Sequence, residues 1–357
     1  MPIAAIDLFC GIGGLTKGLS LAGIDVVAGI DIESSCKYIY EANNPNAKFI
    51  HADVSQVRAA DIVSFYPVDA VRVLTGCAPC QPFSNYTNRY RKEGFMDDKW
   101  RLLYSFLNHI EIIQPDIVAM ENVPQIINQK VFHDFVKRLA EINYSVHFQI
   151  VYCPDYGVPQ KRKRLVLLAS RLGEIDLIPK LYNEENYLTV RHAIGNLPKL
   201  HDGEASSDDP IHVCSRLSEI NFQRIKHSRQ NGTWRDWPQN LQLKCHKKDT
   251  GRTYPSVYGR MGWDEPSPTI TTQFYGYGNG RFGHPEQHRA LSIREGAILQ
   301  SFPSDYIFFK DGESINKRIL GMQIGNAVPV ELGRAIGISI VRHIRGVRDN
   351  ERNIIEK

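Results

Sequence analysis

The sequence predicts an α/β fold in which a doubly wound, mostly parallel sheet is combined with a second, smaller and irregular domain. Three observations support this fold class. Short apolar runs typical of buried strands alternate with segments of helical apolar spacing over residues 1–185. A glycine-rich turn, Gly11-Ile12-Gly13-Gly14, lies between the first such strand and the first helix. The alternation is then lost until about residue 289, where helical spacing returns.

The expected strands share short, continuous apolar runs, which are typical of a parallel sheet with both faces covered. In chain order these runs occupy residues 3–9, 25–30, 49–52, 68–74, 116–120, 145–152 and 165–169. The expected helices share apolar residues at helical spacing. They occupy residues 15–21, 34–42, 102–113, 131–142, 293–299 and 330–341. The helix over 34–42 ends before Pro45, because a proline disfavours helical geometry in the residue before it.

This pattern divides the chain into four segments. Residues 1–185 form the first domain, and residues 186–288, rich in Gly, Pro, Asn, His, Trp and Tyr, form the irregular second domain. Residues 289–345 return to complete the first domain. Residues 346–357 form a charged tail, which we expect to fray.

The composition is that of an ordinary globular protein. The 357 residues are 42% hydrophobic and 23% charged, which excludes collagen-like, disordered and disulfide-scaffold classes. We expect no membrane span, because no apolar run approaches about 18 residues, and no signal peptide, because the N-terminus lacks a basic region. Seven cysteines, an odd number, favour reduced thiols in a cytoplasm. The net charge of +4 permits a nucleic-acid partner.

The glycine turn lies where ligands meet the carboxyl ends of strands in a doubly wound sheet. Asp31 ends the second strand, where a carboxylate accepts hydrogen bonds from ribose hydroxyls, and Asp53 follows the run 49–52, where a carboxylate can bond an adenine amino group. A dinucleotide site needs a third glycine at the position of Thr16, so the turn disfavours NAD. A ligand without a pyrophosphate, such as S-adenosylmethionine, fits better. A tight turn with no ligand stays an alternative.

A second turn follows the run 68–74 and carries Cys80 between Pro79 and Pro82. Proline fixes the backbone, so such a loop holds one side chain rigidly over the ligand edge of the sheet. Three interpretations are open: Cys77 and Cys80 as a redox or zinc half-site, Cys80 as a structural thiol, or Cys80 as a nucleophile beside a cofactor. The chain holds no second Cys-x-x-Cys pair, which disfavours zinc.

Further short motifs accompany these two turns. In chain order the set is Asp7-Leu8-Phe9-Cys10-Gly11-Ile12-Gly13-Gly14, Pro79-Cys80-Gln81-Pro82-Phe83-Ser84, Glu121-Asn122-Val123, Gln160-Lys161-Arg162-Lys163-Arg164, Arg294-Glu295 with Gln300-Ser301-Phe302-Pro303, and Gln323-Ile324-Gly325-Asn326-Ala327-Val328-Pro329. The set resembles, in the same order, the motifs of the cytosine-5 DNA methyltransferase family. The resemblance covers nearly the whole chain except residues 186–265. Ala78 departs from it, because many members carry proline there, but the Pro79-Cys80 pair is kept.

The resemblance implies a Rossmann-like fold that binds S-adenosylmethionine and transfers its methyl group to carbon 5 of cytosine, leaving S-adenosylhomocysteine. It implies that Cys80 adds to carbon 6 of the base and that Glu121 bonds N3 and the exocyclic amine. It also implies that Arg164, with Arg162, supports O2 or the thiolate. Asn122 is expected to hold the loop through its amide. The residues assigned to the cofactor are Phe9, Gly11, Ile12, Gly13, Gly14, Asp31, Ile32, Asp53, Pro79 and Asn326.

The implied substrate is a cytosine within double-stranded DNA, which must be flipped out of the helix to be reached. Residues 186–288 are the expected source of target recognition, because they offer side chains of the kind that read major-groove edges. The resemblance also implies a bacterial, cytoplasmic monomer without membrane contact, acting in a restriction system, with a cognate restriction endonuclease as a candidate partner.

Two other functions stay open at this point. Related enzymes that methylate transfer RNA share these motifs, and a binding module could keep the fold without catalysis. Taken singly, the residues also allow plainer interpretations. Glu121 could cap a helix, the run that contains Arg162 and Arg164 could be a solvated strand edge, and Asn326 could cap the helix that starts near Val330.

Overall fold

The computed structural model describes residues 1–79, 96–248 and 256–355, which fall into two compact units. Unit 1 comprises Met1–Tyr152, Lys163–Leu181 and Val328–Lys357, and unit 2 comprises Cys153–Arg162 and Tyr182–Ala327. The chain therefore leaves unit 1 twice and returns to it twice. The sequence pattern places the last return at residue 289, whereas the compact units place it at Val328.

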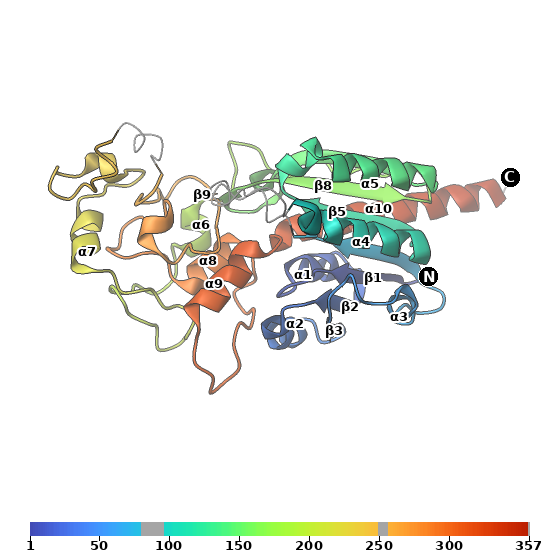
Figure 1. Cartoon of the computed structure of the whole chain (residues 1–357), viewed down its shortest axis with the longest axis horizontal. Helices are drawn as coiled ribbons and strands as arrows, with labels where there is room; N and C mark the ends of the chain where they lie inside the picture. The colour runs from blue at the N-terminus through green and yellow to red at the C-terminus, as the bar shows by residue number, and fades with distance from the viewer. Residues whose placement is uncertain (80–95, 249–255, 356–357) are drawn as a thin grey trace. The chain divides into compact units, whose positions relative to one another are not determined.

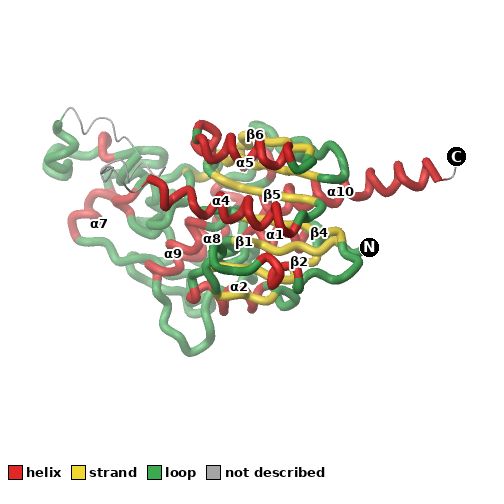
Figure 2. The backbone as a smooth tube through the Cα atoms, turned by 45° about the vertical axis from the view of Figure 1, so that its right-hand side comes forward, coloured by secondary structure: helices red, strands yellow, loops and turns green. Residues whose placement is uncertain are grey.

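Unit 1 is built on a seven-stranded sheet with the strand order β3-β2-β1-β4-β5-β8-β6 (Figure 1; the strands are yellow in Figure 2). The strands are β1 (Ile3–Leu8), β2 (Asp25–Asp31), β3 (Lys48–His51), β4 (Val71–Gly76), β5 (Ile117–Asn122), β6 (Ser145–Tyr152) and β8 (Lys163–Ser170). β1 to β5 are parallel, and β8 runs antiparallel to both β5 and β6. The predicted fold class, a doubly wound and mostly parallel sheet, is confirmed.

Helices cover both faces of this sheet. They are α1 (Gly14–Leu21), η1 (Ser34–Cys36), α2 (Lys37–Asn43), α3 (Ala59–Val63), α4 (Met96–Ile113), η4 (Pro124–Asn128), α5 (Lys130–Glu141) and α10 (Val330–Ile355). α4 and α5 lie on the same face (Figure 1), and α1 packs against α10. That contact requires a glycine, because a Cβ atom on Gly18 would lie 2.4 Å from the carbonyl oxygen of Val330.

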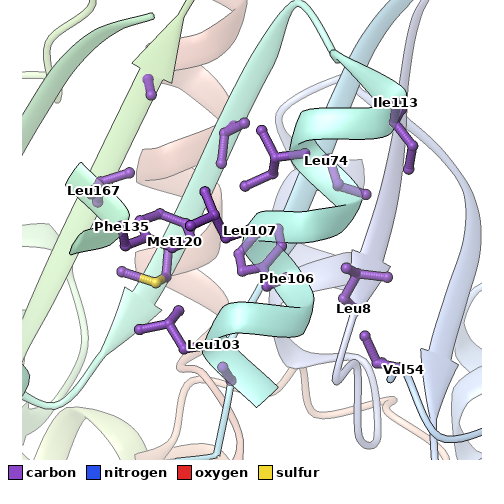
Figure 3. Packing of buried hydrophobic residues seen from close by; sticks show 14 of the residues in the cluster. Leu8, Val54, Leu74, Leu103, Phe106, Leu107, Ile113, Met120, Phe135 and Leu167 are labelled. Carbon is purple, nitrogen blue, oxygen red and sulfur yellow. The ribbon is translucent and has the colours of Figure 1, made fainter. Parts of the chain in front are cut away.

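The core of unit 1 forms where alternate strand residues meet the helices of one face. Leu8, Leu74, Met120 and Leu167 come from four adjacent strands and contact the same apolar cluster as Phe106 of α4 (Figure 3). All five side chains are fully buried. Burial of a large apolar side chain of this kind contributes about 1.5–3 kcal/mol to folding, so the cluster fixes the sheet and, with it, the edge where the strands end.

Unit 2 contains short elements joined by long loops. They are η5 (Cys153–Tyr156), β7 (Gln160–Lys161), α6 (Val190–Ile194), α7 (Glu219–Lys226), η6 (Trp234–Asp236), β9 (Ser267–Pro268), η8 (Tyr277–Asn279), α8 (Ile293–Leu299) and α9 (Lys317–Asn326). β7 and β9 form a two-stranded parallel sheet. The predicted helix over residues 293–299 is confirmed as α8.

Buried charged side chains hold these loops together. The guanidinium of Arg260, which is 2% exposed, donates to the carbonyl oxygens of Ile225, Ser228, His284 and Gln287. In the same unit, both oxygens of the buried Glu295 carboxylate accept hydrogen bonds from a second arginine, Arg289, at 2.6 and 2.8 Å. An aromatic cluster completes the interior and contains Trp234, Trp237, Tyr258, Tyr277 and His246.

Two predicted boundaries are wrong. The strand predicted to start at residue 68 starts at Val71, because Ala70 donates its N–H to the carbonyl of Pro67 in a turn that leaves Val68 90% exposed. The helix predicted over 330–341 continues to Ile355, so most of the charged tail that was expected to fray is helical.

Within the described residues, one helical stretch, Lys317–Asp349, is long and apolar enough to cross a membrane. However, 67% of its apolar window is buried inside the protein. Its larger part is α10, which packs against α1. Burial in the core therefore accounts for the apolar character that the sequence shows here.

Candidate active site

The candidate site lies at the carboxyl edge of the sheet in unit 1. β1, β2, β4 and β5 are parallel and end at this edge, so the loops that follow them meet there. Because β8 runs antiparallel to β5, it begins at the same edge, with Leu165 paired to Asn122. Arg164, one residue before Leu165, consequently lies beside the end of β5.

The glycine turn after β1 has a left-handed backbone. The φ angle is 51° at Gly11 and 85° at Gly13, values that favour glycine, and Phe9 also has a positive φ of 60°. A Cβ atom on Gly11 would meet no described atom within 4 Å, so the turn borders open space. The N–H of Gly11 donates to Asp31 Oδ2 at 2.8 Å, which joins the turn to the end of β2. Ile12, in contrast, points into the protein and is 1% exposed.

Two carboxylates and an apolar side chain lie at or just beyond the ends of the neighbouring strands β2 and β3. Asp31 Oδ1 accepts the N–H of Glu33 at 2.8 Å, and burial raises the pKa of Asp31 above its ordinary value. Ile32 is 66% exposed. Beyond β3, hydrogen bonds from Ser55 lower the pKa of Asp53, so this carboxyl is ionised at neutral pH. Acceptors of this kind beside an exposed aliphatic surface suit a ligand that carries hydroxyl and amino donors on an apolar ring.

Asp7 is a buried carboxyl at the end of β1, just before the turn. Thr16 Oγ1 donates to Asp7 Oδ2 at 2.7 Å, and Thr75 Oγ1 donates to Asp7 Oδ1 at 3.3 Å. Burial raises the pKa of Asp7 to about 7. The sequence places Asp7 in the first motif but gives no sign that its carboxyl titrates near neutral pH.

The Glu121 carboxylate, 2% exposed, lies near the end of β5 with two partners. Arg164 Nε approaches Glu121 Oε1 to 2.8 Å. On the other oxygen, the thiol of Cys77, one residue beyond the end of β4, donates to Glu121 Oε2 at 2.9 Å. The structure therefore brings together two residues that the sequence predicts for the site, Glu121 and Arg164. It adds Cys77, which the sequence analysis considered only as half of a redox or zinc pair.

The loop toward Cys80 is anchored on β5. Asn122 Nδ2 donates to the carbonyl of Ala78 at 3.1 Å, which confirms the prediction that this amide holds the loop. Pro79 is exposed and is the last described residue before the gap. Cys80 lies outside the described residues. Among the residues described, no group of three or more His, Cys, Asp or Glu side chains is placed to hold a metal ion.

Two other predicted residues belong to unit 2. Arg162, which is 4% exposed, donates to the carbonyl of Ile270 at 3.1 Å and to that of Gly325 at 3.5 Å. Arg162 and Arg164 thus differ in surroundings, although the alternation of strand side chains predicts one shared face. Asn326 is exposed and is the last residue of α9.

The geometry agrees with what comparisons with known proteins show. The family model described as C-5 cytosine-specific DNA methylase matches residues 3–342. The chain belongs to this family. It is a DNA (cytosine-5-)-methyltransferase, as the order of its sequence motifs implied.

Several similar proteins are type II methyltransferases. The chain is 50% identical over 352 residues to the type II methylase M.HgiDII of Herpetosiphon aurantiacus, and the match covers 98% of each protein. It is 32% identical to the type II methyltransferase M.Eco47II of Escherichia coli, over 94% of this chain and 78% of that protein. Among solved structures, the S. pombe Dnmt2 methyltransferase shares the fold with a TM-score of 0.58 at 18% identity, over 97% of this chain and 99% of that one.

Proposed function

We propose that Cys80 is the nucleophile of this methyltransferase and that Glu121 and Arg164 are its catalytic partners. One observation carries the proposal: the buried Glu121 carboxylate is paired with the Arg164 guanidinium at 2.8 Å, at the edge where the loop toward Cys80 begins. Cys80 follows Pro79 on that loop. The loop is anchored two residues earlier, at Ala78, to the strand that carries Glu121.

The chemistry requires these residue types. Carbon 5 of cytosine is a poor nucleophile, and addition of a thiolate at carbon 6 turns it into the reactive carbon of an enamine. Negative charge then develops at N3 and O2 of the ring. Glu121 would share a proton with N3 and accept a hydrogen bond from the exocyclic amine, and Arg164 would stabilise charge at O2 or on the Cys80 sulfur. After carbon 5 has taken the methyl group, its proton passes to solvent, the electron pair of that C–H bond re-forms the ring double bond, and the carbon–sulfur bond breaks to return Cys80 as a thiolate.

S-adenosylmethionine supplies an electrophilic methyl group for this reaction. The glycine turn fits such a ligand because it borders open space. The ligand carries no pyrophosphate, so no helix N-terminus has to bind phosphate groups. Asp31 and Asp53 would accept hydrogen bonds from the ribose and the adenine, and Ile32 would cover the ring. The remaining proposed contacts are Phe9, Gly11, Ile12, Gly13, Gly14, Pro79 and Asn326. Ile12 would contribute through its backbone, because its side chain is buried.

Arg162 supports the reaction from unit 2 in this proposal. Its guanidinium fixes the backbone at Ile270 and Gly325, next to the motif that ends with Pro329. Residues 186–288 would read the bases around the target cytosine. The family model supports DNA as the substrate. As the family resemblance implies, the proposal includes duplex DNA, a cognate restriction endonuclease as partner, and a bacterial, cytoplasmic monomer that acts without membrane contact.

The test is methyl transfer by the full chain from radiolabelled S-adenosylmethionine to unmethylated duplex DNA of mixed sequence. Cys80→Ser should lower the rate at least about a thousandfold, as expected when a covalent nucleophile is removed. Glu121→Gln should lower it about a hundredfold to a thousandfold, as for loss of a group that stabilises transition-state charge. Wild-type product sequenced for 5-methylcytosine would give the recognition sequence.

Cys214→Ser is the matched control, because the side chain of Cys214 is fully buried and cannot contact DNA, and it should leave the rate unchanged. A covalent complex between the wild type and DNA that contains 5-fluorocytosine should form, and Cys80→Ser should abolish it. A Cys80→Ser protein with normal turnover would overturn the assignment of the nucleophile.

A further inference from the structure

The Cys77 thiol is placed by the fold itself. Its backbone N–H donates to the carbonyl of Leu8 at 3.4 Å, which ties it to β1. The next residue, Ala78, is held by Asn122 of β5 at 3.1 Å. Cys77 is thus anchored through its own backbone to one neighbouring strand and through the following residue to the other, and its sulfur lies 2.9 Å from Glu121 Oε2. Each of these anchors comes from a strand of unit 1.

We infer that Cys77 is a positioning residue, whose S–H bond orients the Glu121 carboxylate for the base. This inference rests on the proposed role of Glu121. Arg164 pairs with Oε1 by charge, and the hydrogen bond from the Cys77 thiol to Oε2 sets the orientation of the carboxylate before any substrate arrives. A carboxylate held in this way loses less conformational freedom when it binds the base, which is how preorganisation accelerates a reaction.

The weakness of the thiol as a donor suits this role. An S–H group is a weak donor, whereas a hydroxyl or an ammonium binds a carboxylate more strongly. A carboxylate oxygen accepts more than one hydrogen bond, so Oε2 can accept the amino group of the base while the weak S–H bond stays in place. Without Cys77, a buried oxygen of Glu121 would lose its donor, and the carboxylate could turn away from the base.

The experiment compares Cys77→Ala and Cys77→Ser in the full chain, with unmethylated duplex DNA and radiolabelled S-adenosylmethionine as substrates. Cys77→Ala should lower kcat roughly tenfold, the lower end of what a lost hydrogen bond to a charged group costs. The KM values for DNA and for S-adenosylmethionine should change less than about twofold, because the bond matters in the transition state. Cys77→Ser keeps a donor and should restore kcat to within about threefold of the wild type.

Cys214→Ala is the control for loss of a buried thiol. Cys214 lies within residues 186–288, but its side chain is fully buried, donates to the carbonyl of His201 at 3.1 Å and cannot contact DNA. This variant should leave kcat unchanged. The second measurement repeats Cys77→Ala in a Glu121→Gln background, where the alanine should have no further effect on kcat.

Three results would overturn the inference. They are normal kcat in Cys77→Ala, equal loss in the alanine and serine variants at wild-type thermal stability, or the same tenfold loss in the Glu121→Gln background. If Cys77→Ala folds poorly, the kcat of Cys77→Ser and the comparison in the Glu121→Gln background still test the inference. A fully active Glu121→Gln protein is a different result, because it would remove the proposed role of Glu121 itself.

Discussion

The two units of this methyltransferase are held together in different ways. In unit 1, apolar side chains such as Leu74, Phe106 and Met120 interlock between a sheet and helices. In unit 2, Arg260 and the Arg289–Glu295 pair lie in the interior and hold loops through hydrogen bonds. The difference teaches that a chain segment without regular periodicity can still have a specific interior, provided that its buried polar groups satisfy one another.

The largest expected effect tests the apolar interior. Phe106→Ala should lower the free energy of unfolding by about 3–5 kcal/mol, because it removes a fully buried ring and leaves a cavity. Urea denaturation followed by tryptophan fluorescence and circular dichroism measures this. Phe148→Ala is the control, since Phe148 is 38% exposed and should cost much less. Equal losses of unfolding free energy in the two variants would show that apolar packing does not dominate the stability of unit 1.

A second variant breaks the polar interior. Glu295→Gln leaves Arg289 buried without its counter-charge and should cost about 3–5 kcal/mol. Burial raises the pKa of Glu295, but the hydrogen bond and charge of Arg289 outweigh it and lower the pKa to about 2. The pair therefore stabilises the protein above the ordinary pKa of glutamate, and this contribution is lost as pH falls toward 2. Wild-type stability should drop between pH 5 and pH 2, and the variant should show a smaller drop, measured by thermal unfolding at each pH.

Asp7 is the polar exception within the apolar unit, and its titration sharpens the comparison. Its pKa is raised by burial to about 7, so its contribution to stability is greatest below pH 4 and is lost as pH rises through 7. Relative to Asp7→Asn, the wild type should lose about 2 kcal/mol between pH 5 and pH 7, because the slope of about 1.4 kcal/mol per pH unit flattens near the pKa. Asp7→Asn should remove this slope. A slope that persists in the variant would place the titrating group elsewhere.

The smallest effect concerns an exposed pair in unit 2, Arg191 with Asp264, whose side chains are 55% and 76% exposed. Asp264→Ala should shift the thermal midpoint by less than about 2 °C, because exposed ion pairs are well hydrated in both states. Differential scanning calorimetry of Asp264→Ala and Glu295→Gln compares the thermal midpoints of the two variants. A large loss of thermal stability in Asp264→Ala would mean that burial does not explain why the Arg289–Glu295 pair stabilises the protein.

The sequence predicted unit 1 well because its strands and helices bury apolar faces with a regular period. The resemblance to the family implied that Glu121 and Arg164 act together, and the structure brings them to one edge because parallel strands end together and β8 runs the opposite way. Cys77 was missed because a hydrogen bond across two strands leaves no local pattern, although its place one residue after β4 was a usable signal. Arg162 was misjudged in its surroundings, because the unit boundary between it and Lys163 is set by long-range packing.

The packing of α10 on α1 has a consequence for synthesis of the protein. The ribosome must complete the whole of unit 2 before the chain from Val328 onward can cover α1. At about 5–20 residues per second, synthesis of the roughly 300 residues between α1 and α10 takes about 15–60 seconds. During this time the nascent chain presents the uncovered α1 surface around Gly18 to solvent, so a chaperone that shields α1 should raise the yield of active enzyme.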